Sequence, residues 1–408
     1  MKILFIADVP FQEPSSGSEC VLYQQVIGLA RKNIEIFNIT RKNGSSSHCK
    51  LRFLKGIKDA AFIANTSSKL RFFFSLLNTP PKLFNLYLNN YSYTASVCHQ
   101  PFTYFSLFIA GKVRNIPLIY VFHSPNHEEY MLSNKRLNYL ESILLIQLRR
   151  MIEKFCLQKA ERIMVLSQFM KQKVIDLHRI PSDRIIVNPG GVELDRFKPI
   201  EYREMVKKDL GFREDCIHLL TVRNLEPRMG LDNLLKSIKI LKQKMAKIHL
   251  TIGGEGPEKN NLQKLIERFG LMDEVTMTGF IPAEQLPKFY AAADFFILPT
   301  SGLEGFGLVT PESMACGTPV IGTPVGGTKE ILLNFDYNLL CRDYSPEAMA
   351  DGIQKFITLY FKDRKIYQNL RMRCREYVKN NYSWQRHINQ LNSLINETIG
   401  SRHNKNLS

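Results

Sequence analysis

Short apolar runs alternate along the chain with longer segments that have helical periodicity. The runs 118–122 and 295–298 are continuous in apolar residues, and the segment 2–8 is apolar between its charged ends, which is typical of strands buried on both faces of a parallel sheet. Segments 21–31 and 231–242 instead space their apolar residues for one face of a helix. Strands that alternate with helices throughout predict an α/β protein with parallel sheets.

The same pattern predicts the remaining elements. Further strands are expected at 34–39, 95–98, 162–166, 185–192, 218–222, 247–252, 275–278 and 338–341. A long amphipathic helix is expected over 138–160, with Leu140, Leu144, Leu148 and Ile152 on one stripe. Because the chain has 408 residues, a single core is not expected and two domains are.

The stretch 301–330 holds the strongest candidate chemistry. Glu304 and Glu312 have seven residues between them, and the loop Gly305-Phe306-Gly307-Leu308 follows the first glutamate. A buried strand precedes this loop and a helix follows it, with Thr310 as the expected N-cap and Pro311 in the first turn. Such a loop directs backbone N–H groups and a helix N-terminus at a phosphate, while carboxylates accept hydrogen bonds from hydroxyls. Together these features favour a sugar nucleotide.

Each feature also has a simpler explanation, since glutamates often only stabilise a helix dipole and glycines often only turn the chain. The complete string is more specific. It resembles the E-x7-E signature of the retaining glycosyltransferases of family 4, also called glycosyl transferases group 1. The flanking sequences, YAAAD at 290–294 and GTPVI at 317–321, resemble that family as well.

The resemblance covers nearly the whole chain and implies the GT-B fold, an α/β fold of two Rossmann-like domains that face each other across a cleft. It implies an acceptor-binding domain over residues 1–197, with the boundary near Phe197, and a donor-binding domain over 198–383. Residues 384–408 would form a closing helix and tail that pack back toward the first domain.

The resemblance also implies roles for individual residues. Glu312 would accept hydrogen bonds from the donor ribose, and Glu304 would hold a sugar hydroxyl. The N–H groups of Gly305, Phe306, Gly307 and Leu308 would stabilise the departing diphosphate, with Arg228 and Arg223. The other expected donor contacts are Gly17 at the phosphates, Gly254 in a tight turn, and Phe280 and Ile281 at the base.

His123 stands at the end of the expected strand 118–122, in the string YVFHSP. Open α/β sheets place ligand-binding residues at the carboxyl ends of their strands, although an isolated histidine there is often only bonded to a backbone carbonyl. In the family, a histidine after this strand contacts the transferred sugar. The expected catalytic residues are therefore His123, Glu304 and Arg228.

One loop departs from the family pattern, in which Gly-Arg-Leu-x-Pro-x-Lys-Gly supplies an Arg and a Lys to the diphosphate. Alignment on Leu225 places Asn224 at the Arg position and Met229 at the Lys position. Arg223 and Arg228 lie one residue earlier and keep the spacing of five. Three alternatives follow: the loop shifts by one residue to present both arginines, Arg228 acts alone, or the site is weakened.

Composition excludes several classes of function. No apolar run approaches the roughly 18–20 residues of a membrane-spanning helix. The eight cysteines form no Cys-x-x-Cys pair and no cluster with histidine, which argues against zinc and disulfides and favours the cytoplasm. An Asp-x-Asp pair is absent too, so no metal and no other cofactor is expected.

The net charge of +17 is uneven. Residues 1–197 carry 26 Lys+Arg and 14 Asp+Glu, a balance of +12, which leaves +5 for the rest. Between Ile36 and His127 the only acidic residue is Asp59, among eleven basic residues and many aromatics. This region is either a solvated basic face or a contact for an anionic membrane surface. Nucleic acid is not expected as a partner, because no recognition motif is visible.

The interpretation is a retaining, metal-independent glycosyltransferase that uses a nucleoside-diphosphate sugar, with UDP favoured over GDP. The expected acceptor is a saccharide or lipid-linked glycan of the cell envelope, at the inner face of the cytoplasmic membrane. Two alternatives stay open. One is a sugar-nucleotide epimerase of similar fold, and the other is a binding protein weakened by Asn224 and Met229.

Overall fold

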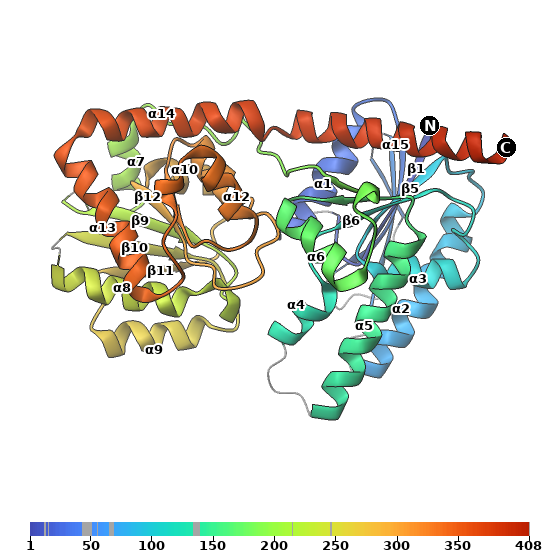
Figure 1. Cartoon of the computed structure of the whole chain (residues 1–408), viewed down its shortest axis with the longest axis horizontal. Helices are drawn as coiled ribbons and strands as arrows, with labels where there is room; N and C mark the ends of the chain where they lie inside the picture. Colours follow the sequence, from blue (N-terminus) through green and yellow to red (C-terminus); the bar gives the residue numbers. More distant parts are fainter. Residues whose placement is uncertain are drawn as a thin grey trace. The chain divides into compact units, whose positions relative to one another are not determined.

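The structure, a computed structural model, describes residues 1–11, 14, 16–42, 51–54, 56–64, 69–133, 139–213, 215–244 and 247–407. Its internal contacts divide the chain into two units (Figure 1). The first unit comprises residues 1–190 and 384–408, and the second comprises 191–383.

The segment just before Phe197 is tied into the second unit by its backbone. The N–H of Val192 donates to the carbonyl of Tyr382 at 2.9 Å. The guanidinium of Arg375 donates to the carbonyls of Leu194 and Phe197 at 2.9 and 2.5 Å. The division between the units therefore falls a few residues before the expected boundary at Phe197.

The first unit is built on an eight-stranded sheet of order β3-β4-β2-β1-β5-β6-β7-β8 among the described residues. All neighbours pair in parallel except β3, which pairs antiparallel with β4. The strands are β1 (Lys2–Ala7), β2 (Glu35–Lys42), β3 (Leu51–Leu54), β4 (Ile57–Ile63), β5 (Ala95–His99), β6 (Leu118–Phe122), β7 (Arg162–Val165) and β8 (Ile185–Val187). Every residue of β5 and β6 is buried, as expected of strands covered on both faces.

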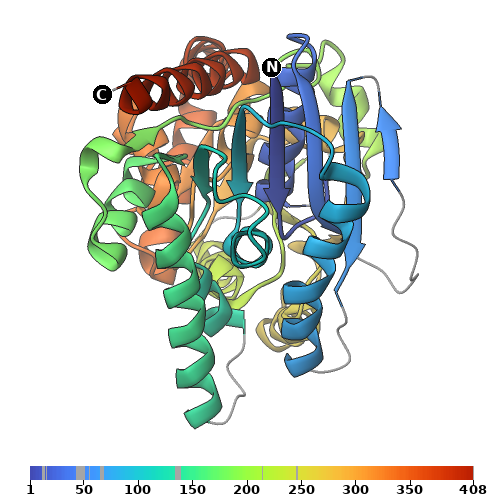
Figure 2. The same cartoon turned by 90° about the vertical axis from the view of Figure 1, so that its right-hand side faces the viewer.

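Helices surround this sheet (Figure 2). They are α1 (Gly17–Ala30), α2 (Lys69–Leu83), the π-helical turn η1 (Phe84–Leu88), α3 (Pro101–Ile109), α4 (Asn126–Ser133), α5 (Tyr139–Lys159), α6 (Gln168–His178), the 3-10 turn η2 (Ser182–Arg184) and α15 (Trp384–Leu407). Within the described ranges, each helix is too short or too polar to span a bilayer.

The second unit has a five-stranded parallel sheet of order β11-β10-β9-β12-β13. Its strands are β9 (Ile217–Val222), β10 (Ile248–Gly253), β11 (Val275–Gly279), β12 (Phe295–Leu298) and β13 (Val320–Gly322). Its helices are α7 (Arg203–Asp209), η3 (Pro227–Met229), α8 (Leu231–Lys244), α9 (Lys259–Phe269), α10 (Leu286–Ala292), α11 (Val309–Ala315), α12 (Gly326–Phe335), η4 (Tyr337–Leu339), α13 (Pro346–Lys362) and α14 (Arg364–Asn381).

Each sheet has a point where the strand order reverses direction. In the first unit the chain builds outward from β1 through β2, then returns to the other side of β1 with β5. In the second unit the reversal lies between β9 and β12. Open α/β sheets bind ligands at the carboxyl ends of the strands beside such a reversal. The fold therefore directs attention to the residues that follow β1, β5, β9 and β12.

Two expectations about individual elements are wrong. The strand expected at 338–341 is the 3-10 turn η4 followed by a single bridge between Leu340 and Gly322, because the Asp336 carboxylate caps the turn at the N–H of Asn338. On α5, Ile152 is buried as expected, but Leu144 is 71% exposed. The expected helix start at Asn138 and the side chain of Leu140 lie outside the described residues. Strands β3, β4 and β13 were not predicted.

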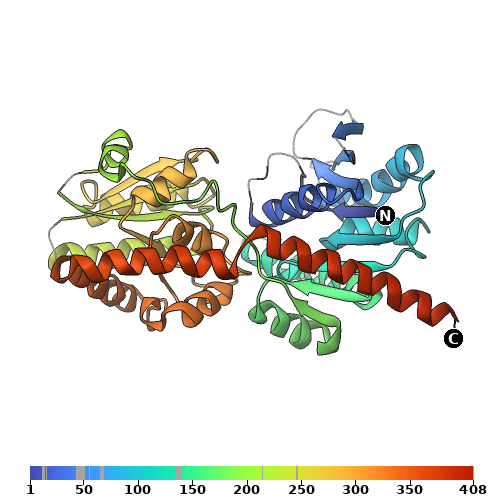
Figure 3. The same ribbon diagram turned by 90° about the horizontal axis from the view of Figure 1, so that it is seen from above.

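Helix α15, at the end of the chain, packs on α1 of the first unit (Figure 3). Its residues Ile388 and Leu391 join the hydrophobic core beside Val26 and Leu29 of α1. Gly28 makes this close approach feasible, because a Cβ atom there would lie 2.6 Å from Cγ1 of Ile388. The first unit is thus completed by the last helix of the chain.

We predict that Gly28→Ala destabilises the protein by about 1–3 kcal/mol, since the added methyl group overpacks the α1–α15 contact. Gly400→Ala on α15 is the matched control, because a Cβ there meets open space. That control should be neutral or slightly stabilising, as alanine favours helix more than glycine does. The measurement is urea unfolding, and equal free energies of unfolding for the two variants would contradict the prediction.

Candidate functional site

The reversal point of the second unit brings a cation and a carboxylate together. Arg223 directly follows β9, while Thr300 and Glu304 follow β12, the neighbouring strand. The guanidinium of Arg223 forms an ion pair with Glu304 and donates to Oγ1 of Thr300 at 2.5 Å. Thr300 in turn donates to Oε2 of Glu304 at 3.1 Å. Both sequence-predicted residues, Arg223 and Glu304, thus lie in one cluster.

The electrostatics of this cluster keep Glu304 ionised. Only 8% of the residue is exposed, and burial by itself raises the pKa of its carboxyl group. The charge and hydrogen bond of Arg223, with the charge of Arg228, more than offset burial, so the pKa lies below its ordinary value. The cluster therefore presents a charged acceptor for hydroxyl groups at neutral pH.

Glycines give the Glu304 loop its shape. A Cβ at Gly326 would lie 2.1 Å from the carbonyl oxygen of Glu304, and one at Gly327 would lie 2.6 Å from Cα of Phe306. Gly307 and Leu303 have positive φ angles of 79° and 46°, and for leucine this conformation is strained. The start of α12 thus packs directly on the loop and fixes its path.

This packing leaves a row of donors. Within the described part of the chain, the backbone N–H groups of Phe306, Gly307 and Leu308 have no hydrogen-bond acceptor. They directly precede α11, whose N-cap is Leu308. The expected N-cap, Thr310, instead lies in the first turn, and its hydroxyl contacts that of Thr328 at 3.2 Å. Consecutive free N–H groups of this kind form an anion-binding concavity.

Arg228 reaches the same loop by donating to the carbonyl of Leu303 at 2.7 Å. Met229, which aligned with the family lysine, is only 5% exposed and belongs to the core. Asn224, which aligned with the family arginine, is an exposed residue. The side chains of Arg223 and Arg228, one residue earlier in each case, are therefore the ones that lie at the Glu304 loop.

Glu312, on α11, is the second predicted carboxylate. The hydroxyl of Tyr290 donates to its Oε2 at 3.2 Å. Burial raises the pKa of Glu312 to about 7, since this single hydrogen bond and distant arginine charge compensate only in part. Glu304 and Glu312 therefore differ in charge state near neutral pH, although the sequence pattern treats them alike.

The remaining predicted donor residues lie at strand ends of the second unit. A Cβ at Gly254 would lie 1.8 Å from the carbonyl oxygen of Arg223, so this glycine lets two strand ends pack. Phe280 is 65% exposed. Ile281 is buried, and its Cδ1 occupies the space where Gly253 would carry a side chain.

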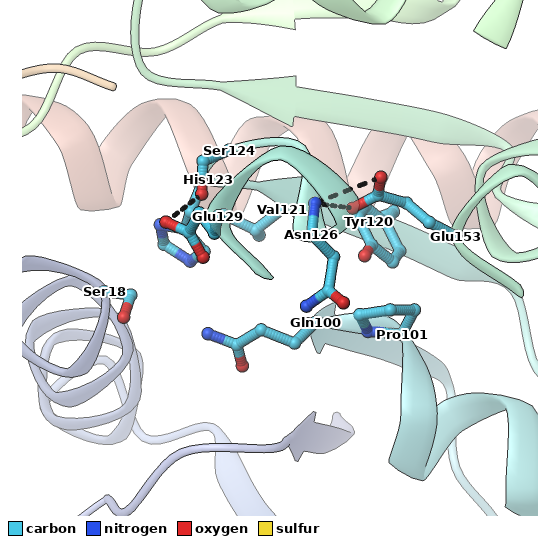
Figure 4. A pocket seen from close by; sticks show the side chains of 10 residues that line it. All are labelled: Ser18, Gln100, Pro101, Tyr120, Val121, His123, Ser124, Asn126, Glu129 and Glu153. Atoms are coloured by element: carbon cyan, nitrogen blue, oxygen red, sulfur yellow. Dashed lines mark hydrogen bonds between the residues drawn. The ribbon is translucent and has the colours of Figure 1, made fainter. Parts of the chain in front are cut away.

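The first unit carries a small pocket near its own reversal point (Figure 4). The pocket contains His123, which follows β6, and Gln100, which follows β5 and holds a positive φ of 74°. The lining residues are Ser18, Gln100, Pro101, Tyr120, Val121, His123, Ser124, Asn126, Glu129 and Glu153. Gly17, the other site residue predicted in this unit, is the first residue of α1 and adjoins Ser18.

Sequence reasoning missed several residues of both clusters. Thr300 and Tyr290 hold the two glutamates of the second unit, and Glu153 accepts from the N–H of Asn126 at 3.1 Å in the pocket. Tyr290 lies in the quoted YAAAD string, which was the only available signal. No group of three or more potential metal ligands occurs among the residues that the structure describes.

We predict that Glu312→Gln stabilises the protein at pH 8 but not at pH 4.5. A carboxyl whose pKa rises from 4.5 to about 7 on folding weakens the folded state progressively as pH increases through that interval. The expected gain at pH 8 is about 1–3 kcal/mol by urea unfolding. Glu267→Gln, at an exposed position of α9, is the control, and a pH-independent effect of Glu312→Gln would refute the assignment.

Two family profiles match the chain. The family profile described as Glycosyltransferase Family 4 matches residues 15–196, and that of Glycosyl transferases group 1 matches residues 203–381. The chain is 35% identical over 176 residues to the D-inositol 3-phosphate glycosyltransferase of Paenarthrobacter aurescens, covering 42% of this chain and 43% of that protein. It spans about half the length of the curated relatives it matches.

Solved structures share the fold. Sucrose-phosphate synthase from Thermosynechococcus elongatus has a TM-score of 0.82 at 21% identity, over 98% of this chain and 100% of that one. The Anabaena protein HepE in complex with UDP has a TM-score of 0.72 at 17% identity, over 97% and 100% of the two chains. The expected α/β fold class of GT-B type is confirmed, and the chain belongs to the group 1, family 4 glycosyltransferases.

Proposed function

We propose that this protein is a retaining, metal-independent glycosyltransferase that uses a nucleoside-diphosphate sugar, with UDP favoured over GDP. The observation that carries the proposal is the ionised, buried Glu304 next to two arginines and to three backbone N–H groups that have no acceptor in the described ranges. A site with both kinds of group suits a donor that carries hydroxyls and a diphosphate.

In the proposed reaction the bond from the anomeric carbon to the diphosphate oxygen breaks, and its electron pair leaves with the diphosphate. The N–H groups of 306–308, with Arg228 and Arg223, stabilise this developing charge without a metal ion. The acceptor oxygen attacks from the face that the diphosphate leaves, and its proton passes to a phosphate oxygen. Glu304 holds a sugar hydroxyl, Glu312 accepts from the ribose, and neither serves as a general acid.

His123 of the first unit positions the transferred sugar in this proposal, and Gly17 approaches the phosphates. Phe280 and Ile281 adjoin the base, and Gly254 and Asn224 border the donor. A binding protein without turnover was considered because Met229 takes the place of the family lysine. Met229 is a core residue, however, and Arg228 lies at the Glu304 loop in its stead, which argues against that alternative. An epimerase would need acids and bases around the sugar carbon, whereas this chain carries the E-x7-E string that is typical of the transferases.

We predict that the protein releases nucleotide slowly from one UDP- or GDP-sugar with magnesium chelated. Glu304→Ala should lower the rate by about 100-fold or more, since removal of one preorganised polar group costs several kcal/mol at a transition state. Glu304→Gln separates loss of charge from loss of volume, and Glu347→Ala on the surface of α13 is the control. A strict requirement for a divalent metal would contradict the mechanism, and donor binding without turnover, even with lipid acceptors, would favour the binding protein.

For the acceptor, we propose a saccharide or lipid-linked glycan of the cell envelope, reached from an anionic membrane surface through the first unit. Support comes from apolar side chains exposed on α2, α4 and α5, namely Phe74 (55%), Met131 (52%), Ile143 (42%) and Leu144 (71%). Helices α2 and α5 extend past the ends of the strands on the same side of the sheet (Figure 2). The excess positive charge of residues 1–197 would attract anionic lipid to these side chains.

We predict that the protein binds vesicles containing phosphatidylserine at low salt, measured by co-sedimentation. The double variant Ile143→Ser and Leu144→Ser should bind about tenfold more weakly, because it removes apolar area that enters the interface. Met372→Ser on α14 removes a comparably exposed residue of the second unit and should bind as the wild type does. Absence of wild-type binding to these vesicles would remove the membrane from the proposal.

A further inference from the structure

A chain of hydrogen bonds runs from the pocket of the first unit into its core. Nε2 of His123 lies 2.9 Å from Nδ1 of His99, and Nε2 of His99 lies 3.0 Å from Oε1 of Gln25. Nε2 of Gln25 lies 3.0 Å from Nε2 of His387, whose Nδ1 lies 2.8 Å from the carbonyl oxygen of Pro189. Gln25, His99 and His387 are at most 1% exposed, so this hydrogen-bond chain has one end in the pocket and three buried members.

The terminal carbonyl sets the direction of every bond. A carbonyl oxygen only accepts, so Nδ1 of His387 carries the hydrogen and Nε2 of a neutral ring is the acceptor. The amide nitrogen of Gln25 therefore donates to His387, and its oxygen accepts from Nε2 of His99. Nδ1 of His99 is then the acceptor, which requires that Nε2 of His123 carries the hydrogen. By the same logic Nδ1 of His123 has a free lone pair.

The alternative direction needs a charged ring. If the amide of Gln25 were reversed, His387 would have to donate from both nitrogens and carry a positive charge. Burial opposes this, because it lowers the pKa of His387 to about 4. Burial likewise lowers the pKa of His123 to about 4 and holds that of His99 well below its ordinary value. No carboxylate belongs to the hydrogen-bond chain, so the neutral arrangement is the one that fits.

The contact between α1 and α15 brings the distant members together. Gln25 lies one helical turn before Gly28, and His387 precedes Ile388, the residue that packs against Gly28. The N–H of the Asn188 side chain donates to the carbonyl of His387 at 3.1 Å and holds that part of α15 in place. The last helix of the chain thus contributes a residue to the support of the pocket.

We propose that Gln25, His99 and His387 are positioning residues that hold His123 in its neutral Nε2–H tautomer, so that Nδ1 accepts a hydrogen bond from a substrate hydroxyl. Within the described part of the chain Nδ1 of His123 has no partner, and His123 lines the pocket. A neutral acceptor at this place selects a hydroxyl rather than an anion. The substrate side of this inference rests on the proposed glycosyltransferase function, whereas the tautomer does not.

The direct test is nitrogen NMR of the whole protein labelled with ¹⁵N-histidine, at pH 7.5. The two ring nitrogens of His123, assigned by comparison with His123→Asn, should show a protonated Nε2 and an unprotonated Nδ1. The ring should stay neutral down to about pH 5. A protonated Nδ1 in the wild type, or a cationic ring at pH 7.5, would overturn the proposal without any reference to activity.

Variants of Gln25 and His387 test the positioning. Gln25→Leu leaves Nε2–H of His99 without an acceptor, so the tautomers of His99 and His123 should shift and kcat for donor turnover should fall about tenfold or more, with a smaller change in KM. His387→Gln keeps an acceptor for the amide of Gln25 and a donor for the carbonyl of Pro189, so it should retain both the His123 tautomer and most of kcat. Ser96→Ala removes a buried hydrogen bond on β5 outside the hydrogen-bond chain and should change neither.

The outcomes separate this inference from the proposed function. A wild-type protein with the stated tautomer but no turnover on any donor would keep the tautomer assignment and refute the glycosyltransferase. Turnover combined with a wild-type spectrum and kcat in Gln25→Leu would refute the positioning role alone. If Gln25→Leu fails to fold, the wild-type spectrum and His387→Gln still decide, because loss of the tautomer in His387→Gln contradicts the mechanism.

Discussion

The site of the second unit depends on compensation of one buried charge, that of the Glu304 carboxylate. A carboxylate removed from water is tolerated only with a cation and hydrogen-bond donors close to it, and loss of such a partner costs about 3–5 kcal/mol. Arg223 supplies the cation and Thr300 adds a hydroxyl. Glycines at 326 and 327 let a neighbouring helix cover the loop that carries the glutamate. Because the loop is held in this way, the N–H groups of Phe306, Gly307 and Leu308, which have no acceptor among the described residues, remain available to an anion.

The two units solve the problem of a buried polar site in opposite ways. The second unit uses an ion pair, in which the charge of Arg223 keeps Glu304 ionised. The first unit uses rings that burial keeps neutral, linked through Gln25 to a backbone carbonyl. Each arrangement lies at the reversal point of its sheet, where strand ends leave room for a ligand. The second unit therefore presents a charged acceptor, and the first unit presents a neutral one.

The spacing of residues along the sequence made part of both candidate sites predictable. The E-x7-E string located the loop after β12, and the position of His123 followed from the apolar run before it. The loop with Asn224 and Met229 was ambiguous, because only the burial of Met229 shows which of two adjacent residues points to the core. Leu144 fitted a helical stripe yet is exposed, since α5 extends past the sheet it covers. His387 was beyond sequence reasoning, because its partner Gln25 lies more than three hundred residues away along the chain.

We propose that the Glu304 loop holds a nucleoside diphosphate through backbone N–H groups and arginines, without a metal ion. The most direct measurement is a crystal structure of the protein with UDP bound, from crystals grown in EDTA. We expect phosphate oxygens within hydrogen-bond distance of the N–H groups of 306–308 and of Arg228, with the ribose hydroxyls at Glu312. A nucleotide bound at another place, or a diphosphate that binds only through a divalent metal, would contradict it.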